Sequence, residues 1–270
     1  MKYLLTFLFL LMFSAQVSSE PQIPEESTQF CKSSREYITT FNFFTKNKEF
    51  GLNQDEIKKT SFEVSKGCTN ASQRFIKIFK LLTEVGIDTR TSIKYAQDFA
   101  QLKDQFTEAF ITLFKFTYNP DLLDLNVLDA LEITLALTKN QKDSIKNTMA
   151  DFEDLVEYCL EHESMELPHK KCASIAMQVT LTGQKYKIKM AKSFIQFLDF
   201  LQENKKGPQI DKTSALSRTL ELINYGPLSY KNFSQAYSFA ISKTGLKYST
   251  IDAMKFATQM AKKSIQESKK

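Results

Sequence analysis

The chain has 270 residues, and its 36 basic and 31 acidic residues give a formal net charge of +5. Hydrophobic residues make up 42% and charged residues 25%, which excludes a disordered, collagen-like or polytopic membrane protein. Seven glycines and six prolines leave few turns, which argues against an all-β sandwich and favours long helices. Two histidines and no glycine-rich phosphate loop argue against most catalytic machinery.

The first nineteen residues have the layout of a secretory signal peptide. Lys2 supplies a positive start, residues 4–13 are mostly apolar, and small or polar residues fill 14–19. The apolar run is shorter than the roughly 20 residues that a transmembrane helix needs. We predict cleavage after Ser19, with cleavage after Val17 as the alternative. The mature protein is then expected to be extracellular or periplasmic, with no transmembrane span.

A theme of two helices separated by a short break recurs along the mature chain. Each copy predicts an aromatic-rich helix, a break, an anchoring leucine or isoleucine, and a second helix with a small or apolar residue five positions after the anchor. Apolar residues four positions apart, as in Phe106, Phe110 and Phe114, form a stripe on one helix face. The anchors are spaced by 35, 38, 42, 43 and 36 residues, a period typical of helical-hairpin repeats: Leu52, Ile87, Leu125, Leu167, Ile210 and Leu246.

This pattern predicts an all-α fold of about six antiparallel αα-hairpins, stacked as an α-solenoid-like or compact helical array and stapled by disulfides. An irregular helical bundle is the alternative. Several chain-breaking residues agree with the frame: Gly51 and Gly86 precede anchors, and Gly183 is expected to close a second helix. No glycine or proline lies between Ser92 and Tyr118, so the break between those two helices cannot be placed.

A polar stretch divides the mature chain into two parts with three anchors each. This stretch, residues 139–147, is interpreted as a linker or as the polar start of a helix. We predict an N-terminal linker over 20–29, one half over 30–138 and a second half over 148–264. Residues 265–270 are expected to form a basic, frayed tail.

Four cysteines in a secreted chain predict two disulfides. Residues equidistant from the turn of an antiparallel hairpin lie opposite each other. Cys31 and Cys68 are centred on the first predicted turn, and Cys159 and Cys172 on the fourth. We therefore predict sequential pairing, which ties the open end of the first hairpin and the neck of the fourth.

Both histidines lie between the second pair of cysteines, so a metal site is an alternative to that disulfide. Cys159, His162, His169 and Cys172 form the pattern C-x2-H-x6-H-x2-C, which could present four tetrahedral ligands to zinc. The spacing matches no established zinc family, and an oxidising compartment favours the disulfide. The preferred prediction has no metal and no cofactor, and these four residues are kept as the metal candidates.

An acidic run precedes the same turn. Asp151, Asp154, Glu157 and Glu161 follow the spacing of a stripe along one helix face. The stripe is interpreted as a solvated face. The functional alternative is an acidic patch for a basic partner or a weak cation site.

The sequence contains no serine-hydrolase elbow, metalloprotease motif or dinucleotide fingerprint. We predict a non-enzymatic repeat protein that binds a protein or peptide on a concave or grooved surface. Aromatic side chains often dominate binding energy, so three tyrosines near the hairpin ends are the candidate anchors: Tyr225, Tyr230 and Tyr248.

Two other functions are kept as alternatives. The 23 phenylalanines could line a cavity for an apolar small molecule or lipid, which would make the protein a carrier. A metal-dependent hydrolase is the less favoured class. No run of basic residues indicates nucleic-acid binding. Asn70 and Asn232 begin N-glycosylation triplets, which matter only in a eukaryotic source.

Overall fold

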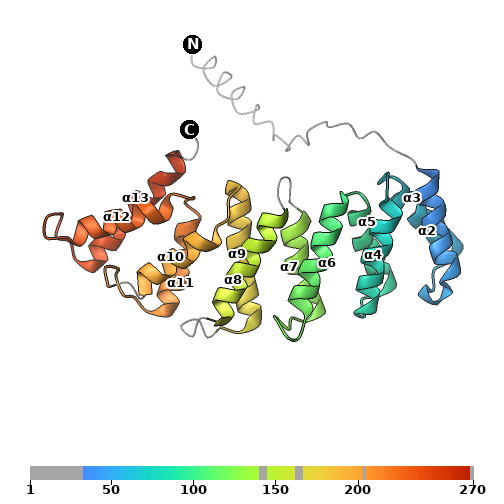
Figure 1. Ribbon diagram of the computed structural model, residues 1–270, viewed down its shortest axis with the longest axis horizontal. Coiled ribbons are helices and arrows are strands. Elements are labelled where there is room, and N and C mark those ends of the chain that lie inside the picture. The colour runs from blue at the N-terminus through green and yellow to red at the C-terminus, as the bar shows by residue number, and fades with distance from the viewer. Residues whose placement is uncertain (1–32, 140–144, 162–166, 203–204, 268–270) are drawn as a thin grey trace, which may run out of the picture.

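The computed structural model describes residues 33–139, 145–161, 167–202 and 205–267. Within these ranges the chain forms twelve α-helices, one short 3-10 helix and no strand, which confirms the predicted all-α class (Figure 1). The α-helices are α2 (Ser34–Lys46), α3 (Gln54–Ser65), α4 (Ala71–Glu84), α5 (Thr89–Ala100), α6 (Asp104–Tyr118), α7 (Val127–Lys139), α8 (Ile145–Glu161), α9 (His169–Tyr186), α10 (Ala191–Gln202), α11 (Lys212–Ile223), α12 (Ser229–Ile241) and α13 (Thr250–Glu267).

Consecutive helices contact one another in pairs. The closest contacts join α2 with α3, α4 with α5, α6 with α7, α8 with α9, α10 with α11, and α12 with α13. We call the earlier member of each pair its first helix and the later member its second helix. First helices of neighbouring pairs also touch, from α2 with α4 to α10 with α12, and so do second helices such as α3 with α5 and α11 with α13. Figure 1 shows the pairs following one another from α2/α3 to α12/α13.

The second helices start at a fixed distance from their anchors. In the first five pairs the second helix begins two residues after the predicted anchor. The residue between them is often an N-cap whose side chain accepts a hydrogen bond from a backbone N–H of the first turn. Asn53 accepts from Glu56, Asp88 from Thr91, and Asp211 from Ser214. An apolar anchor followed by a capping residue therefore starts these helices.

The sixth anchor is Tyr248 rather than the predicted Leu246. α13 begins at Thr250, and the Tyr248 N–H donates to the Ala240 carbonyl over 2.8 Å. The Ile210 N–H returns to the end of its own first helix in the same way. The residue five positions after Tyr248 is Ala253, which is fully buried, whereas Ile251 is 68% exposed.

Three details differ from the predicted boundaries. Gly183 lies inside α9, three residues before its end. A Cβ at this position would sit 2.6 Å from the Ile188 carbonyl oxygen, so the glycine allows the chain after α9 to pass close to the helix. α13 continues to Glu267, so the first three residues of the predicted tail are helical. α8 begins at Ile145, so the last three residues of the polar stretch 139–147 are the start of a helix. The division into halves stays a prediction, and the signal peptide and N-terminal linker lie outside the described residues.

The buried phenylalanines pack against one another. Phe44, Phe50 and Phe79 meet with ring centroids 4.8–6.1 Å apart in edge-on arrangements. The ring centroids of Phe99 and Phe110 lie 4.5 Å apart, and further along the row Phe233 meets both Phe197 and Phe200, at 5.7 and 6.2 Å. Such pairs stabilise a core beyond the area that they bury. Regular phenylalanine spacing therefore reflects core packing here.

One of the two predicted disulfides lies in the described part of the chain. Cys159, near the end of α8, is bonded to Cys172, near the start of α9, with the Cα atoms 5.8 Å apart. This confirms the predicted pairing across the fourth turn. Cys31 lies outside the described residues, so its pairing with Cys68 stays a prediction. Among the described residues, no helix has the length and apolar content needed to cross a membrane.

Candidate functional site

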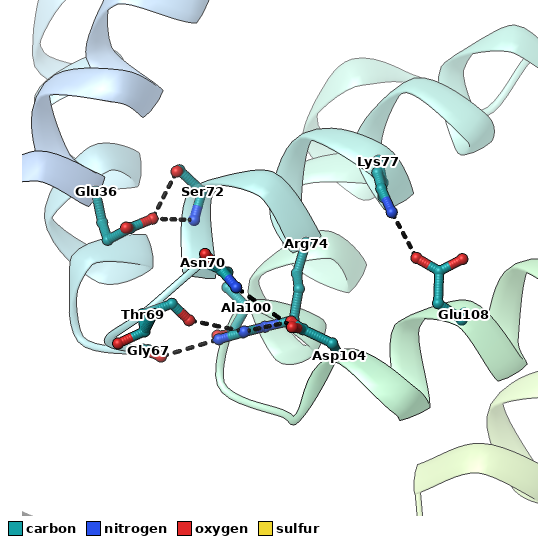
Figure 2. A network of polar contacts seen from close by, with 10 residues as sticks. All are labelled: Glu36, Gly67, Thr69, Asn70, Ser72, Arg74, Lys77, Ala100, Asp104 and Glu108. Carbon is teal, nitrogen blue, oxygen red and sulfur yellow. Dashed lines mark hydrogen bonds and ion pairs between the residues drawn. The ribbon is translucent and has the colours of Figure 1, made fainter.

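A buried carboxylate joins the first helix of one pair to the first helix of the next. Glu36 on α2 is 5% exposed, and its Oε2 accepts from the Ser72 backbone N–H over 2.7 Å and from the Ser72 hydroxyl over 2.6 Å (Figure 2). Ser72 lies in the first turn of α4, where unpaired N–H groups favour a negative charge. We call this contact the α2–α4 joint.

Arg74 extends the polar network from α4 to the next connection. Its buried guanidinium donates from Nη1 to the Thr69 carbonyl and from Nη2 to the Gly67 carbonyl, over 2.8 and 3.0 Å. It also donates from Nη1 to Asp104 Oδ1 and from Nη2 to the Ala100 carbonyl, both over 2.8 Å (Figure 2). Arg74 thus holds the end of α5 and the start of α6.

These contacts place the helix break that the sequence could not locate. The chain leaves helical geometry between Ala100 and Asp104 without a glycine or proline. The Ala100 carbonyl is satisfied by Arg74 instead of by a following turn. The hydrogen bond from Arg74, together with one from Asn70, lowers the pKa of Asp104 below its ordinary value. Charge-assisted bonds of this kind are stronger than neutral ones.

A second carboxylate makes an equivalent joint later in the chain. Asp151 on α8 is 2% exposed, accepting from the Met190 N–H at Oδ2 over 3.0 Å and from the Ala191 N–H at Oδ1 over 2.8 Å. It lies 16 residues before its anchor (151 to 167), as Glu36 does (36 to 52). Burial raises the pKa of Asp151, while the two N–H donors oppose that shift. We call this contact the α8–α10 joint.

Asp151 therefore does not belong to a solvated acidic stripe. The other three predicted stripe residues, Asp154, Glu157 and Glu161, are exposed on α8. The helix spacing was right, but the sequence did not reveal that the start of α10 covers the first position. Across the described ranges, no three His, Cys, Asp or Glu side chains come together in a way that could hold a metal ion. The cation-site alternative has no geometric support.

At the fourth turn the disulfide uses two of the four candidate zinc ligands. Both sulfur atoms, of Cys159 and Cys172, are in the disulfide and are not available as thiolates. The Nδ1 atom of His169 lies 3.1 Å from the Leu123 carbonyl oxygen. His162 lies outside the described residues.

Two of the three candidate tyrosines are engaged inside the protein. The Tyr225 hydroxyl donates to Glu221 Oε1 over 2.8 Å. Burial and this carboxylate raise the pKa of Tyr225 to about 12. The ring of Tyr230 packs edge-on against Phe197, with centroids 5.2 Å apart. The ring of Tyr248 packs edge-on against Phe256, with centroids 6.2 Å apart, but the residue is 44% exposed.

Two open grooves lie between second helices at opposite ends of the row. The α11/α13 groove has a volume of about 630 Å³ and is formed by one face of α11 and a methionine of α13. The α3/α5 groove has a volume of about 240 Å³. The α11/α13 groove is lined by Ile210, Asp211, Thr213, Ser214, Ser217, Arg218, Glu221 and Met254.

Hydroxyl groups dominate the exposed wall of the α11/α13 groove. Thr213 and Ser214 lie four and three residues before Ser217, so both neighbour Ser217 on the groove side of α11. Arg218 lies beside them and pairs with Glu221 over 2.9 Å. The sequence did not point to this face of α11, because its only signal there is small polar residues at helical spacing.

The α11/α13 groove offers hydroxyl groups, one guanidinium, the carboxylates of Asp211 and Glu221, and an apolar edge. That combination suits the binding of a polar chain segment, in which backbone amides meet hydroxyl groups and side chains meet apolar surface. The described groove residues include no histidine or cysteine. No model of a protein family, no curated protein and no solved structure matches the chain, so its site is interpreted from its own geometry.

Proposed function

We propose that the protein is a non-enzymatic helical-repeat scaffold that binds a protein or peptide in the grooves between its second helices. The observation that carries this proposal is the α11/α13 groove, an open groove of about 630 Å³ walled by hydroxyl-bearing side chains. A second groove lies between α3 and α5, which are also second helices, at the other end of the row. It supports the proposal that the layer of second helices is the binding face.

The repeat interpretation rests on how neighbouring pairs touch. First helices contact first helices and second helices contact second helices, as expected for hairpins stacked in an α-solenoid. Glu36 and Asp151, at equivalent positions in two pairs, both cap the following first helix. Stacked hairpins present one layer of helices as a continuous surface, which is how solenoids bind extended partners.

The proposed ligand is an extended polar segment. Hydroxyl groups of Thr213, Ser214 and Ser217 can both donate to and accept from a peptide backbone. The charges of the lining are balanced, because Arg218 pairs with Glu221 and Asp211 also lines the groove, so the segment is expected to be polar rather than strongly charged. The carrier alternative gains no support, since the buried phenylalanine rings contact one another.

We further propose that the protein works in an extracellular or periplasmic compartment. The layout of residues 1–19 and the Cys159–Cys172 disulfide support this location, because disulfides persist in oxidising compartments.

Selection of peptides from a displayed random library tests the groove directly. Peptides enriched on the wild-type protein are measured against two variants that each gain an arginine. Ser217→Arg fills the groove, whereas Ser238→Arg changes an exposed serine on first helix α12 outside it. We expect at least about tenfold weaker binding to S217R, the cost of about 1.4 kcal/mol, and unchanged binding to S238R.

Two results would contradict the proposal. One is equal binding of the selected peptides to S217R and wild type. The other is a failure to enrich any peptide over an unrelated helical protein. Circular dichroism of both variants shows that neither substitution unfolds the chain.

A further inference from the structure

Exposed apolar side chains gather at one turn of the molecule. Five of them lie within thirteen residues around the α12–α13 connection, where Phe239 is 53% and Ile251 is 68% exposed. A smaller group of three, Tyr118, Leu122 and Leu128, lies around the α6–α7 connection, and the other large exposed apolar residues, such as Ile38, are scattered. We call this group the terminal tip: Phe239, Ile241, Leu246, Tyr248 and Ile251.

The terminal tip is a defined turn. The Gly245 N–H donates to the Ser242 carbonyl over 3.1 Å, and the Tyr248 N–H returns to Ala240. A Cβ on Gly245 would collide with the Phe239 carbonyl oxygen, so the turn is closed tightly. Figure 1 places this connection at the end of the row farthest from α2/α3. The grooves described above do not include residues of the tip.

Basic residues surround these apolar side chains. Lys243, Lys247 and Lys255 are exposed within or beside the turn. The one acidic residue between positions 239 and 255 is Asp252. Its carboxylate accepts from the Ser249 hydroxyl over 2.7 Å and lies 3.7 Å from the Lys255 ammonium. The tip therefore has an excess of positive charge and favours an anionic partner.

We propose that the terminal tip docks on an anionic lipid surface. The apolar side chains would enter the boundary between headgroups and acyl chains, while the lysines contact anionic headgroups. Tyrosine suits this boundary because its ring is apolar and its hydroxyl is polar, while phenylalanine and isoleucine can enter the apolar side. The protein would lie on the membrane, since no described helix has the character of a span.

A lipid surface fits the tip better than a protein surface does. A stable protein interface covers about 800 Å² on each partner, more than the exposed parts of five side chains at one turn provide. A bilayer needs no matching cavity for a projecting turn. This inference concerns a surface outside the grooves and does not depend on the proposed peptide binding.

Vesicle flotation with the full chain tests the proposal. We expect binding to vesicles of phosphatidylcholine mixed with phosphatidylserine, and much weaker binding to phosphatidylcholine alone. Binding should also fall as salt is added, because salt screens the lysines. All variants keep residues 1–32, so any contribution of the apolar run at residues 4–13 is common to them.

Two apolar positions form a matched pair. Ile251 and Leu128 both lie three residues after their anchors and are 68% and 72% exposed. Ile251→Ser should weaken binding to the anionic vesicles by about tenfold. This is the order of the free energy gained when one isoleucine side chain leaves water, which the serine variant loses. Leu128→Ser, on α7, should bind like the wild type.

Two lysines form a matched pair for charge. Lys243 follows the end of α12, and Lys46 ends α2 at the other end of the row. Lys243→Glu should weaken vesicle binding by about fivefold or more, while Lys46→Glu should leave it unchanged.

The proposal is wrong if wild type does not float with anionic vesicles, or if I251S and L128S lose binding equally. It is also wrong if size-exclusion chromatography shows a wild-type dimer that I251S dissociates without any vesicle binding. That last outcome would assign the tip to contact between two copies of the chain.

Discussion

The α2–α4 and α8–α10 joints do the same task with different geometry. At the first, one oxygen of Glu36 accepts from two donors of a single residue, Ser72. At the second, each oxygen of Asp151 accepts from a different backbone N–H, those of Met190 and Ala191. We therefore expect an amide to replace the carboxylate with little loss in the α2–α4 joint but not in the α8–α10 joint.

The two joints also differ in their surroundings. Beside Ser72, Arg74 on the same helix ties together three carbonyls and Asp104. Beside Asp151 there is a glycine, Gly183, at which a Cβ would come within 3.2 Å of Oδ2. The first region is held by a spread network, and the second by one carboxylate in a tight space. Substitutions in the two regions should show whether stability depends on many hydrogen bonds in the first and on one carboxylate in the second.

The largest expected effect is at Arg74. Arg74→Met keeps the apolar stem but removes the donor of three carbonyls and the charged partner of Asp104, which keeps its hydrogen bond from Asn70. We therefore expect a loss of about 3 kcal/mol or more in the free energy of unfolding. Arg90→Met is the control, because its exposed pair with Glu56 should contribute less than about 1 kcal/mol. Urea denaturation measures both. Equal losses would show that the Arg74 network does not hold the first region.

The next effect separates the two carboxylates. Asp151→Asn must turn an amide N–H₂ toward a backbone N–H, so we expect a loss of about 2 kcal/mol in the free energy of unfolding. Glu36→Gln keeps one oxygen that can accept from both Ser72 donors, so its loss should stay below about 1 kcal/mol. Urea denaturation at neutral pH measures both variants. A larger loss for E36Q than for D151N would contradict the geometric comparison.

A smaller effect is the opposite pH dependence of the two regions. The pKa of Asp104 is lower in the folded protein than its ordinary value of 3.8. Its contribution to the free energy of unfolding is therefore present above pH 3.8 and is lost as the pH falls through the lower pKa of the folded state. The pKa of Asp151 is higher in the folded protein than its ordinary value. Its contribution to the free energy of unfolding is therefore largest below pH 3.8 and declines as the pH rises through the higher pKa of the folded state.

Unfolding measured on both sides of pH 3.8 tests this contrast. The stability difference between wild type and Asp104→Asn should grow as pH rises, while the difference between wild type and Asp151→Asn should shrink. Any cost of D151N that remains at neutral pH reflects its mismatched hydrogen bonds. Differences that change with pH in the same direction would refute the contrast.

The sequence predicts the helices well where local signals are strong. An apolar anchor followed by Asn or Asp sets the start of three second helices, and these starts follow from capping alone. The break after Ala100 could not be predicted, because a guanidinium 26 residues away ends that helix. Leu246 was mistaken for the sixth anchor because the last connection is two residues longer than the apolar spacing indicates.

The candidate site was harder to predict. Asp151 has the spacing of a surface stripe, and only the fold shows that the start of α10 covers it. Tyr225 and Tyr230 lie near hairpin ends as predicted, but neighbouring side chains engage them. The hydroxyl wall of the α11/α13 groove has no motif, because serine and threonine are ordinary on exposed helix faces. Burial and neighbours across the chain decide these roles.

The central claim is that a carboxylate on one first helix caps the next first helix and so holds successive pairs together. Native-state hydrogen exchange of single amides tests it most directly. In D151N, the amides of Met190 and Ala191 should exchange markedly faster while that of Ser72 does not change, and in E36Q all three should keep their protection. Undiminished protection of Met190 and Ala191 in D151N would contradict the claim.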